Sequence, residues 1–221
     1  MTRHTCMRKY HRNLYILRSP IKQVMSDNLF VALEGIDGSG KTTVINSLKE
    51  QREDIYYTKE PTESWVGNWA RQCVQYDETH PLTDFYMLQA DRAHHLQEKI
   101  FPALEEGRTV VTDRYVDSTR AYQSVALDPV LEEPHSFIDA AMRPFPEPDI
   151  VLYIDIPAEE GIERCSGNDK FEQLDFLKQV RSNYQSMAAS RENIKRIEGQ
   201  RHPSDVADGV RNLISVFEEE L

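Results

Sequence analysis

The chain has 221 residues, of which 39% are hydrophobic and 9% aromatic, and this length and composition are typical of one globular domain with a sizeable core. Its net charge is −11, which argues against general nucleic-acid binding, because that function needs cations against phosphates. No apolar run approaches the roughly 20 residues that a membrane span requires.

Residues 1–24 form a basic leader with six Lys or Arg and no Asp or Glu. The rest of the chain holds 20 basic and 37 acidic residues, a charge of −17. The leader has three interpretations: a targeting presequence, a disordered tail, or an artefact of the start site, since Met25 lies just before the first strand. We favour the last two. The acidic remainder suggests a surface that keeps the protein hydrated in high salt. An apo protein that stays folded at low salt and loses solubility in molar salt would contradict this hypothesis.

Short apolar runs bounded by turn residues recur along the chain and predict buried parallel strands. They lie at residues 30–34, 54–58, 109–112, 149–155 and, more weakly, 193–199. Helical patterns lie between them, at residues 42–52, 82–106, 171–189 and 203–220. The Pro-rich residues 143–149 indicate a segment that connects into the fourth predicted strand. This alternation predicts a doubly wound α/β domain.

A glycine-rich loop, GIDGSGKT, follows the first strand. Gly35, Gly40, Lys41 and Thr42 match the GxxxxGK[ST] motif between a strand and a helix, as the motif requires. Backbone N–H groups of such a loop surround phosphates, and the helix N-terminus adds positive potential. We expect Lys41 to reach the β- and γ-phosphates and Thr42 to ligate Mg²⁺. The loop therefore predicts a nucleoside triphosphate site, rather than a glycine turn that only joins two elements.

The predicted helix over residues 82–106 carries an arginine on its apolar stripe. Arg92 lies one turn after Leu88, on the face that otherwise points to the core. A guanidinium there needs a partner. We expect either an internal carboxylate, such as Asp91 or Glu98, or a ligand.

The third strand ends in an acid and an arginine, within VVTDRYVDSTRAYQS. Asp113 follows a buried strand and is placed to hold the water shell of Mg²⁺. Arg114 offers a bidentate fork for a phosphate oxygen. The alternative is an Asp-Arg pair that only caps the following helix.

Neither the cysteines nor the histidines predict a transition-metal site. The three cysteines are far apart and form no CxxC pair, which fits a reducing cytoplasm. His94 and His95 are adjacent and point to different faces of the predicted helix. We interpret them as ordinary surface or half-buried residues.

Several segments together resemble the thymidylate kinase (dTMP kinase) family, over roughly residues 28–215. They are FVALEGIDGSGKTT, TKEPT, ADRAHH, PALEEGRTVVTDRYVDSTRAYQ and PEPDIVLYIDIPAEEGIERC. The loop is generic, but its spacing to the other segments is more specific. The resemblance implies a P-loop kinase domain over residues 25–221, with a parallel five-stranded sheet flanked by helices as in nucleoside monophosphate kinases. It also implies transfer of the γ-phosphoryl group from ATP to dTMP, for dTTP biosynthesis, by a cytoplasmic homodimer that uses Mg²⁺.

The resemblance also assigns roles to residues. Asp37 would lie near the sugar 3′-hydroxyl and the acceptor phosphate, Arg92 would bond the thymine edge, and Tyr122 and Gln123 would flank the base. The implied substrate-binding residues are Asp37, Lys59, Leu88, Arg92, Arg114, Tyr122 and Gln123. The implied catalytic residues are Asp37, Lys41, Asp113 and Arg114, and the implied metal ligands are Thr42 and Asp113, partly through water. The implied ATP-binding residues are Gly35, Ile36, Asp37, Gly38, Ser39, Gly40, Lys41, Thr42, Thr43 and Arg164.

The chain departs from the family pattern at two of these positions. Lys59 stands where relatives often have arginine, and it supplies charge but no bidentate fork. Leu88 stands where the motif LLFAADR places a phenylalanine on the thymine ring. Stacking contributes very roughly 1 kcal/mol beyond burial, so its loss weakens base binding severalfold unless Phe85 or Tyr122 replaces it.

Residues 163–173 lie where the family has a lid over the phosphates. The candidate lid cations are Arg164 and Lys170, and lid closure would exclude water that hydrolyses ATP. Adenine contacts are expected near Arg164 and in the loop after residue 197. The alternative is that both cations belong to a solvated helix end.

We expect Lys170→Ala to lower kcat with little change in dTMP affinity, because a lid cation stabilises charge on the transferring group. Steady-state kinetics with both substrates test this prediction. Turnover equal to that of the wild type would remove Lys170 from the mechanism.

Two rival functions remain open at this point. Leu88 favours a related kinase with a different nucleoside monophosphate acceptor. A nucleotide-switched binding module of the GTPase type is the other, but the sequence has no NKxD-like motif and no DxxG after the third strand. For the preferred reading, a thymidylate kinase, the expected partners are ATP and dTMP, with no nucleic acid or membrane.

Overall fold

One parallel sheet runs through the part of the chain that this computed structural model describes, residues 28–76, 78–165, 171 and 173–220. Its strands are β1 (Phe30–Glu34), β2 (Tyr56–Lys59), β3 (Val110–Asp113), β4 (Ile150–Asp155) and β5 (Ile194–Glu198). They are ordered β2-β3-β1-β4-β5, and each neighbouring pair is parallel. The predicted fold class and strands are confirmed, although β2 begins at Tyr56 rather than at residue 54. Residues 1–24 and Lys170 lie outside the described residues.

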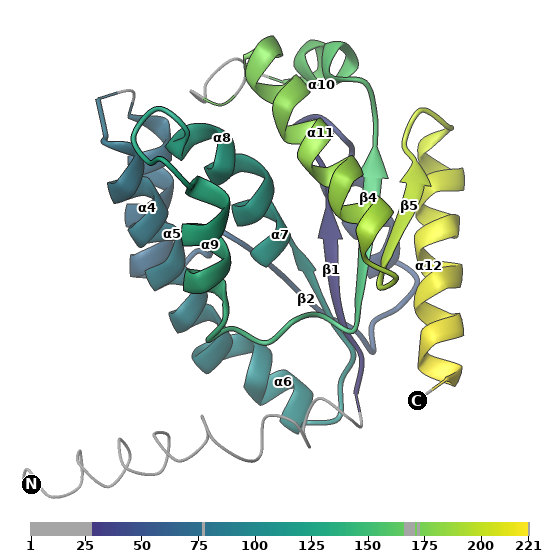
Figure 1. Cartoon of the computed structure of the whole chain (residues 1–221). Coiled ribbons are helices and arrows are strands. Elements are labelled where there is room, and N and C mark those ends of the chain that lie inside the picture. The colour runs from purple at the N-terminus through teal and green to yellow at the C-terminus, as the bar shows by residue number, and fades with distance from the viewer. Residues whose placement is uncertain (1–27, 77, 166–170, 172, 221) are drawn as a thin grey trace, which may run out of the picture.

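Helices connect the strands and cover both faces of the sheet (Figure 1). They are α3 (Lys41–Lys49), α4 (Trp65–Gln75), α5 (Pro81–His95), η1 (Leu96–Ile100), α6 (Phe101–Glu105), α7 (Val116–Ser118), η2 (Thr119–Gln123), α8 (Ser124–Leu127), α9 (Pro134–Met142), α10 (Ala158–Arg164), α11 (Leu174–Ser190) and α12 (Pro203–Glu219). The predicted helix over residues 82–106 is present as consecutive α5, η1 and α6, where η1 is a π-helical turn. Two predicted bounds were wrong, because α3 ends at Lys49 and α11 begins at Leu174.

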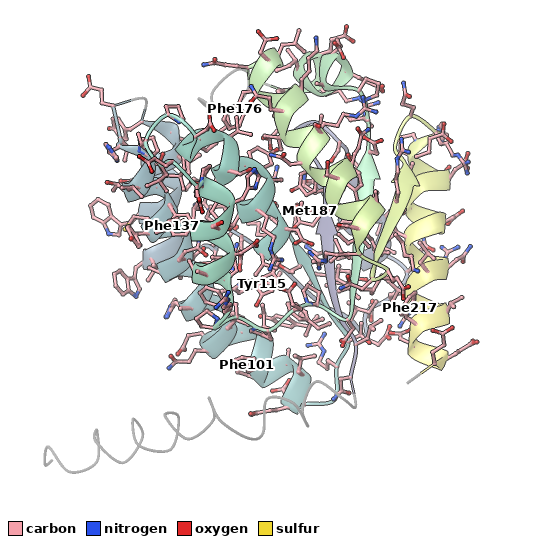
Figure 2. The ribbon with its side chains drawn as sticks, in the orientation of Figure 1. Phe101, Tyr115, Phe137, Phe176, Met187 and Phe217 are labelled. Carbon is pink, nitrogen blue, oxygen red and sulfur yellow. The ribbon has the colours of Figure 1, made fainter. Side chains whose placement is uncertain are left out.

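Both faces of the sheet are buried, each under its own hydrophobic cluster. Along β1, Phe30 and Ala32 belong to the cluster under α5, α6, α9 and α11, whereas Val31 and Leu33 belong to the cluster under α3 and α12. In Figure 2, Tyr115 marks the first cluster and Phe217, on α12, lies on the other side. This burial on two faces explains why the three central strands, β1, β3 and β4, are largely apolar, whereas the edge strand β5 alternates.

The parallel arrangement brings the carboxyl ends of the strands to one edge of the sheet. The polar residues that end three neighbouring strands, Glu34, Lys59 and Asp113, therefore lie close together. In open α/β sheets this edge is the usual place for a ligand site.

Candidate functional site

The glycine-rich loop turns tightly between β1 and α3. Gly38 has φ +74°, and a Cβ there would lie 2.3 Å from the carbonyl oxygen of Gly161, so only glycine fits. Gly40, with φ +93°, caps α3 at its N-terminus. The backbone N–H groups at the start of α3 consequently face the space in front of the loop, where they can bind an anion.

Lys41 folds back over this loop. Its Nζ donates to the carbonyls of Gly35 (3.1 Å) and Ile36 (3.0 Å) and to Ser39 Oγ (3.3 Å). Burial, followed by the nearby Arg114 charge, lowers the pKa of Lys41 to about 8, against the opposing effect of neighbouring carboxylates. Lys41 is thus a partly desolvated cation held by neutral acceptors, and a phosphate can replace them.

Asp37 and Arg114 form an ion pair at the mouth of the loop. Arg114 Nη2 lies 2.5 Å from Asp37 Oδ1, and Tyr122 donates its hydroxyl to Asp37 Oδ2 at 2.8 Å. Burial opposes ionisation of Asp37, but the charges of Arg114 and Lys41 and the bond from Tyr122 outweigh it and lower the pKa of Asp37. Arg114 has φ +70°, a left-handed conformation that is unusual for a non-glycine residue. Its guanidinium also lies 4.9 Å from the centre of the Tyr122 ring.

Asp113 has an unused acceptor at the end of β3. Its Oδ1 is buried and is one of the few such side-chain atoms, among the described residues, without a hydrogen-bond partner. Asp113 and Thr42 line the same cavity. Mg²⁺ is typically held by one or two protein oxygens together with water and substrate phosphates, so these two oxygen ligands fit Mg²⁺. No group of three metal-binding side chains occurs within the described residues.

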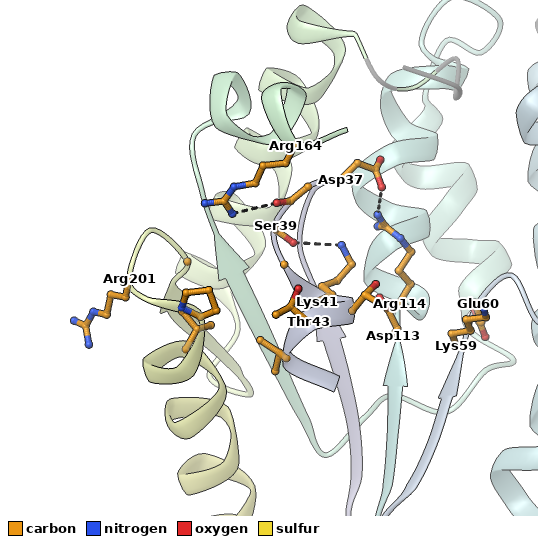
Figure 3. A pocket seen from close by; sticks show the side chains of 17 residues that line it. Asp37, Ser39, Lys41, Thr43, Lys59, Glu60, Asp113, Arg114, Arg164 and Arg201 are labelled. Atoms are coloured by element: carbon orange, nitrogen blue, oxygen red, sulfur yellow. Dashed lines mark hydrogen bonds and ion pairs between the residues drawn. The ribbon is translucent and has the colours of Figure 1, made fainter. Parts of the chain in front are cut away.

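A cavity of about 600 Å³ extends from the loop (Figure 3). Figure 3 shows Lys41, Asp113 and Arg114 on one side of it and Arg164 and Arg201 on the other. Arg164 Nη1 donates to the Gly38 carbonyl at 3.3 Å. The loop residues from Asp37 to Thr43 and Lys59 also line the cavity. The sequence did not individually predict several other residues that line the cavity, namely Glu60, Gly199, Arg201, Pro203 and Val206.

A smaller cavity of about 120 Å³ lies beside the first and shares Asp37, Glu60 and Arg114 with it. Its remaining lining includes Leu88, Arg92, Thr119, Tyr122, Gln123 and Phe171. Gln123 is 1% exposed, and its Oε1 is buried without a hydrogen-bond partner. Phe85 is fully buried in the first hydrophobic cluster, so Tyr122 and Phe171 are the aromatic rings at this cavity.

The partner of Arg92 differs from the predicted carboxylates. Glu60 Oε2 accepts from Arg92 Nε (3.0 Å) and Nη2 (2.7 Å). Asp91 instead accepts from the backbone N–H (2.7 Å) and hydroxyl (2.5 Å) of Thr62. Arg92 therefore pairs with neither Asp91 nor Glu98. Its partner Glu60 directly follows β2 and lies 32 residues earlier in the sequence.

Three further residues complete the surroundings of the site. His95 is fully buried, not at the surface, and its ring contacts Thr58 and Glu60. His94 is half-buried and its ring lies 6.3 Å from Trp65. Lys59 lines the larger cavity but is about half exposed, and it pairs with Glu63 at 2.9 Å.

Comparison with known proteins gives a consistent result. The model of a family described as thymidylate kinase matches residues 33–210. A probable thymidylate kinase of Natronomonas pharaonis is 39% identical over 193 residues, covering 86% of this chain and 98% of the relative. A probable thymidylate kinase of Methanococcoides burtonii is 41% identical over 164 residues, covering 72% of this chain and 81% of the relative. One of Pyrobaculum aerophilum is 36% identical over 189 residues, covering 84% and 95%.

Proposed function

The chain belongs to the thymidylate kinase family, and from this premise we propose how its residues transfer the γ-phosphoryl group of ATP to dTMP, giving dTDP and ADP for dTTP synthesis. The observation that carries the proposal is the position of the Asp37–Arg114 pair, which lines both cavities. A donor in the larger cavity and an acceptor in the smaller one would meet at this pair.

The donor occupies the larger cavity. The N–H groups at the start of α3 and Lys41 bind the β- and γ-phosphates, and Lys41 exchanges its three loop acceptors for phosphate oxygens. The adenine lies toward Arg164, Arg201 and Pro203, at the far end of the same cavity.

Thr42 and Asp113 would hold Mg²⁺, partly through water. The orphaned Asp113 Oδ1 and the oxygen-only ligand set support this assignment. When bound, the ion neutralises charge on the phosphates and orients them.

The acceptor occupies the smaller cavity. Arg114 binds its phosphate as a bidentate fork, and Asp37 accepts from the sugar 3′-hydroxyl. Tyr122 orients Asp37, and burial raises the pKa of Tyr122, so that its hydroxyl stays protonated as a donor.

The base edge is read by one donor and one acceptor. Arg92 supplies an N–H to the carbonyl at C4 of the base, and Gln123 Oε1, which lacks a partner, accepts from the N3–H group. Cytosine presents the opposite pattern, an amino group at C4 and a bare N3, so it would leave both protein groups unpaired. Leaving a buried polar group unpaired costs about 1–3 kcal/mol, which favours thymine.

Catalysis then consists of positioning and electrostatic stabilisation. An oxygen of the acceptor phosphate forms the new bond to the γ-phosphorus. The bond between the γ-phosphorus and the oxygen that bridges the β- and γ-phosphates breaks, and ADP leaves. Lys41 and Arg114 stabilise the charge on the transferring group, and Arg164 adds charge from α10.

We expect Leu88→Phe to lower the KM for dTMP by about threefold to fivefold, because an aromatic ring in the smaller cavity adds a stacking contact worth about 1 kcal/mol. Leu88→Met, which changes packing without adding a ring, is the matched control and should leave the KM within about twofold. Steady-state kinetics at saturating ATP check both variants. A higher KM in Leu88→Phe would show that the ring obstructs the base.

An acceptor panel tests the proposed function. Purified enzyme is assayed with ATP and Mg²⁺ against dTMP, dUMP, dCMP and dGMP, and we expect the largest kcat/KM for dTMP. Leu88 favours one alternative, a kinase for a different nucleoside monophosphate. Turnover of another monophosphate without activity on dTMP would establish that alternative.

A further proposal concerns assembly and compartment. We infer a homodimer formed through α4 and α5, whose outer faces leave Trp65 71%, Trp69 57% and Tyr86 57% exposed. Sedimentation equilibrium should give twice the chain mass.

The widely spaced cysteines support a reducing cytoplasm. Within the described ranges, no helix has the length and hydropathy of a membrane span.

A further inference from the structure

A continuous chain of buried polar groups runs from β2 to Arg92. Thr58 Oγ1 lies 2.6 Å from His95 Nε2, and His95 Nδ1 lies 3.0 Å from Glu60 Oε1. The other carboxylate oxygen, Glu60 Oε2, accepts both Nε and Nη2 of Arg92. The side chains of His95, Glu60 and Arg92 are 0%, 6% and 3% exposed, so these three groups are shielded from water, whereas Thr58 at the end of the chain is partly buried.

The partners of Arg92 divide its nitrogens into two groups. Nε and Nη2 are held by the Glu60 carboxylate and by the carbonyl of Tyr115 (2.9 Å). Nη1 donates to neutral groups, the side-chain oxygens of Gln89 and Thr119, each at 2.8 Å, and Met142 Sδ at 3.4 Å. Hydrogen bonds to charged groups are stronger than those to neutral ones. Nη1 is therefore the nitrogen that can exchange a partner for a ligand, and Thr119 lies on the smaller cavity.

His95 fixes the orientation of the Glu60 carboxylate, which holds Nε and Nη2 of Arg92. With Nδ1 protonated, the ring donates to Glu60 and accepts the Thr58 hydroxyl at Nε2, so that a neutral His95 satisfies both ends. The terminal torsion of a glutamate is otherwise broad. Without His95, the Glu60 carboxylate would be free to rotate and would no longer hold Nε and Nη2 together. A group that acts through its neighbour in this way resembles the outer-shell partners that orient metal ligands.

We propose that Glu60 and His95 are positioning residues that hold Arg92 so that Nη1 faces the base of the acceptor. This inference rests on the proposed function, in which Arg92 contacts the base carbonyl. Selection of the base then depends on His95, which lies behind Arg92. His95 does not line the acceptor cavity and is fully buried.

Variants at position 95 test the proposal. His95→Phe keeps a ring and removes the donor, and we expect about a tenfold higher KM for dTMP, the size of losing one hydrogen bond to a charged group. The kcat and the KM for ATP should stay within about twofold, because the lost contact is remote from the transferring group. His95→Asn places an amide N–H near Nδ1 and should return the KM to within about threefold of the wild type. His94→Phe, on the same helix and against Trp65, is the matched control and should change neither KM.

Base discrimination supplies the second readout. The ratio of kcat/KM for dTMP over dCMP should fall in His95→Phe, since Arg92 no longer reads the carbonyl that distinguishes the two bases. Thr58→Val removes the hydroxyl at the far end of the chain and should raise the KM for dTMP about threefold, so the proposal remains testable if His95→Phe does not fold. An unchanged KM for dTMP in His95→Phe, or in Thr58→Val where His95→Phe does not fold, would overturn the proposal, as would parallel losses for ATP and dTMP. Wild-type enzyme without dTMP turnover would instead reject the proposed function.

Discussion

Lys41→Ala should lower kcat at least about a thousandfold, which corresponds to about 4 kcal/mol of transition-state stabilisation. Lys41 is the buried cation of the phosphate loop, and its Nζ lies within 3.3 Å of three loop oxygens that a nucleotide would displace. Alanine leaves the charge that develops on the transferring group without this partner. Coupled assays of ADP release at saturating ATP and dTMP measure the effect, and the affinity for ATP should also weaken.

A second lysine on the same helix gives the control for this experiment. Lys49 lies in the last turn of α3, and its Nζ lies 5.9 Å from the centre of the Tyr57 ring, away from the loop. Lys49→Ala should keep kcat within about twofold. Thermal unfolding of both variants separates loss of chemistry from loss of fold. Activity of Lys41→Ala within tenfold of the wild type would show that the loop does not hold the transferring phosphates.

Arg114→Ala should lower kcat/KM for dTMP at least about a hundredfold, or about 3 kcal/mol. Among the described residues, Arg114 is the cationic side chain that lines both cavities, and it holds Asp37 at 2.5 Å. The side chains of Arg114 and Asp37 are 18% and 29% exposed, so the loss lies toward the lower end of the roughly 2–5 kcal/mol that truncating one partner of a buried charge pair costs. The variant loses both the phosphate contact and the orientation of Asp37, whereas the KM for ATP should change less. Initial rates over a matrix of both substrate concentrations give the two effects separately.

The control arginine lies at the other end of the same strand. Arg108 precedes β3 and donates to the backbone carbonyls of Asp54 and Ile55. Arg108→Ala should therefore leave both KM values within about twofold. Arg114→Lys keeps the charge but loses the fork and should fall between the wild type and Arg114→Ala. Equal losses toward ATP and dTMP in Arg114→Ala would mean that Arg114 serves the donor instead of the acceptor.

The sheet was predictable from sequence because its strands are buried on both faces. The run FVALE is apolar up to its last residue, Glu34, and all five of its residues are buried. The phosphate loop was predictable because its geometry depends on glycines at fixed spacing, and these determine the backbone whatever the rest of the chain does.

Helix α4 was not predicted from the sequence. Its apolar residues, buried Val66 and Ala70 and exposed Trp65 and Trp69, follow the helical period, so the helix itself was within reach of sequence reasoning. The exposed rings carry no local signal that distinguishes a surface for a partner from the core.

Contacts between distant segments were also beyond local reasoning. A partner for Arg92 was expected on its own helix, where spacing is informative, but it is Glu60, at the end of β2. His95 was expected to be a surface or half-buried residue, yet it is fully buried against the same carboxylate. Both features depend on β2 packing beside α5, which neither composition nor periodicity encodes.

A crystal structure with dTMP and a non-hydrolysable ATP analogue tests the central claim, that donor and acceptor meet at Asp37 and Arg114. We expect the dTMP phosphate on Arg114, the base against Leu88, and its C4 carbonyl on Arg92 Nη1. A neighbouring cavity of about 740 Å³, lined by Lys49, His94 and Lys99 among others, offers the clearest rival position. Binding of dTMP in that cavity, with Arg114 still paired only to Asp37, would contradict the account.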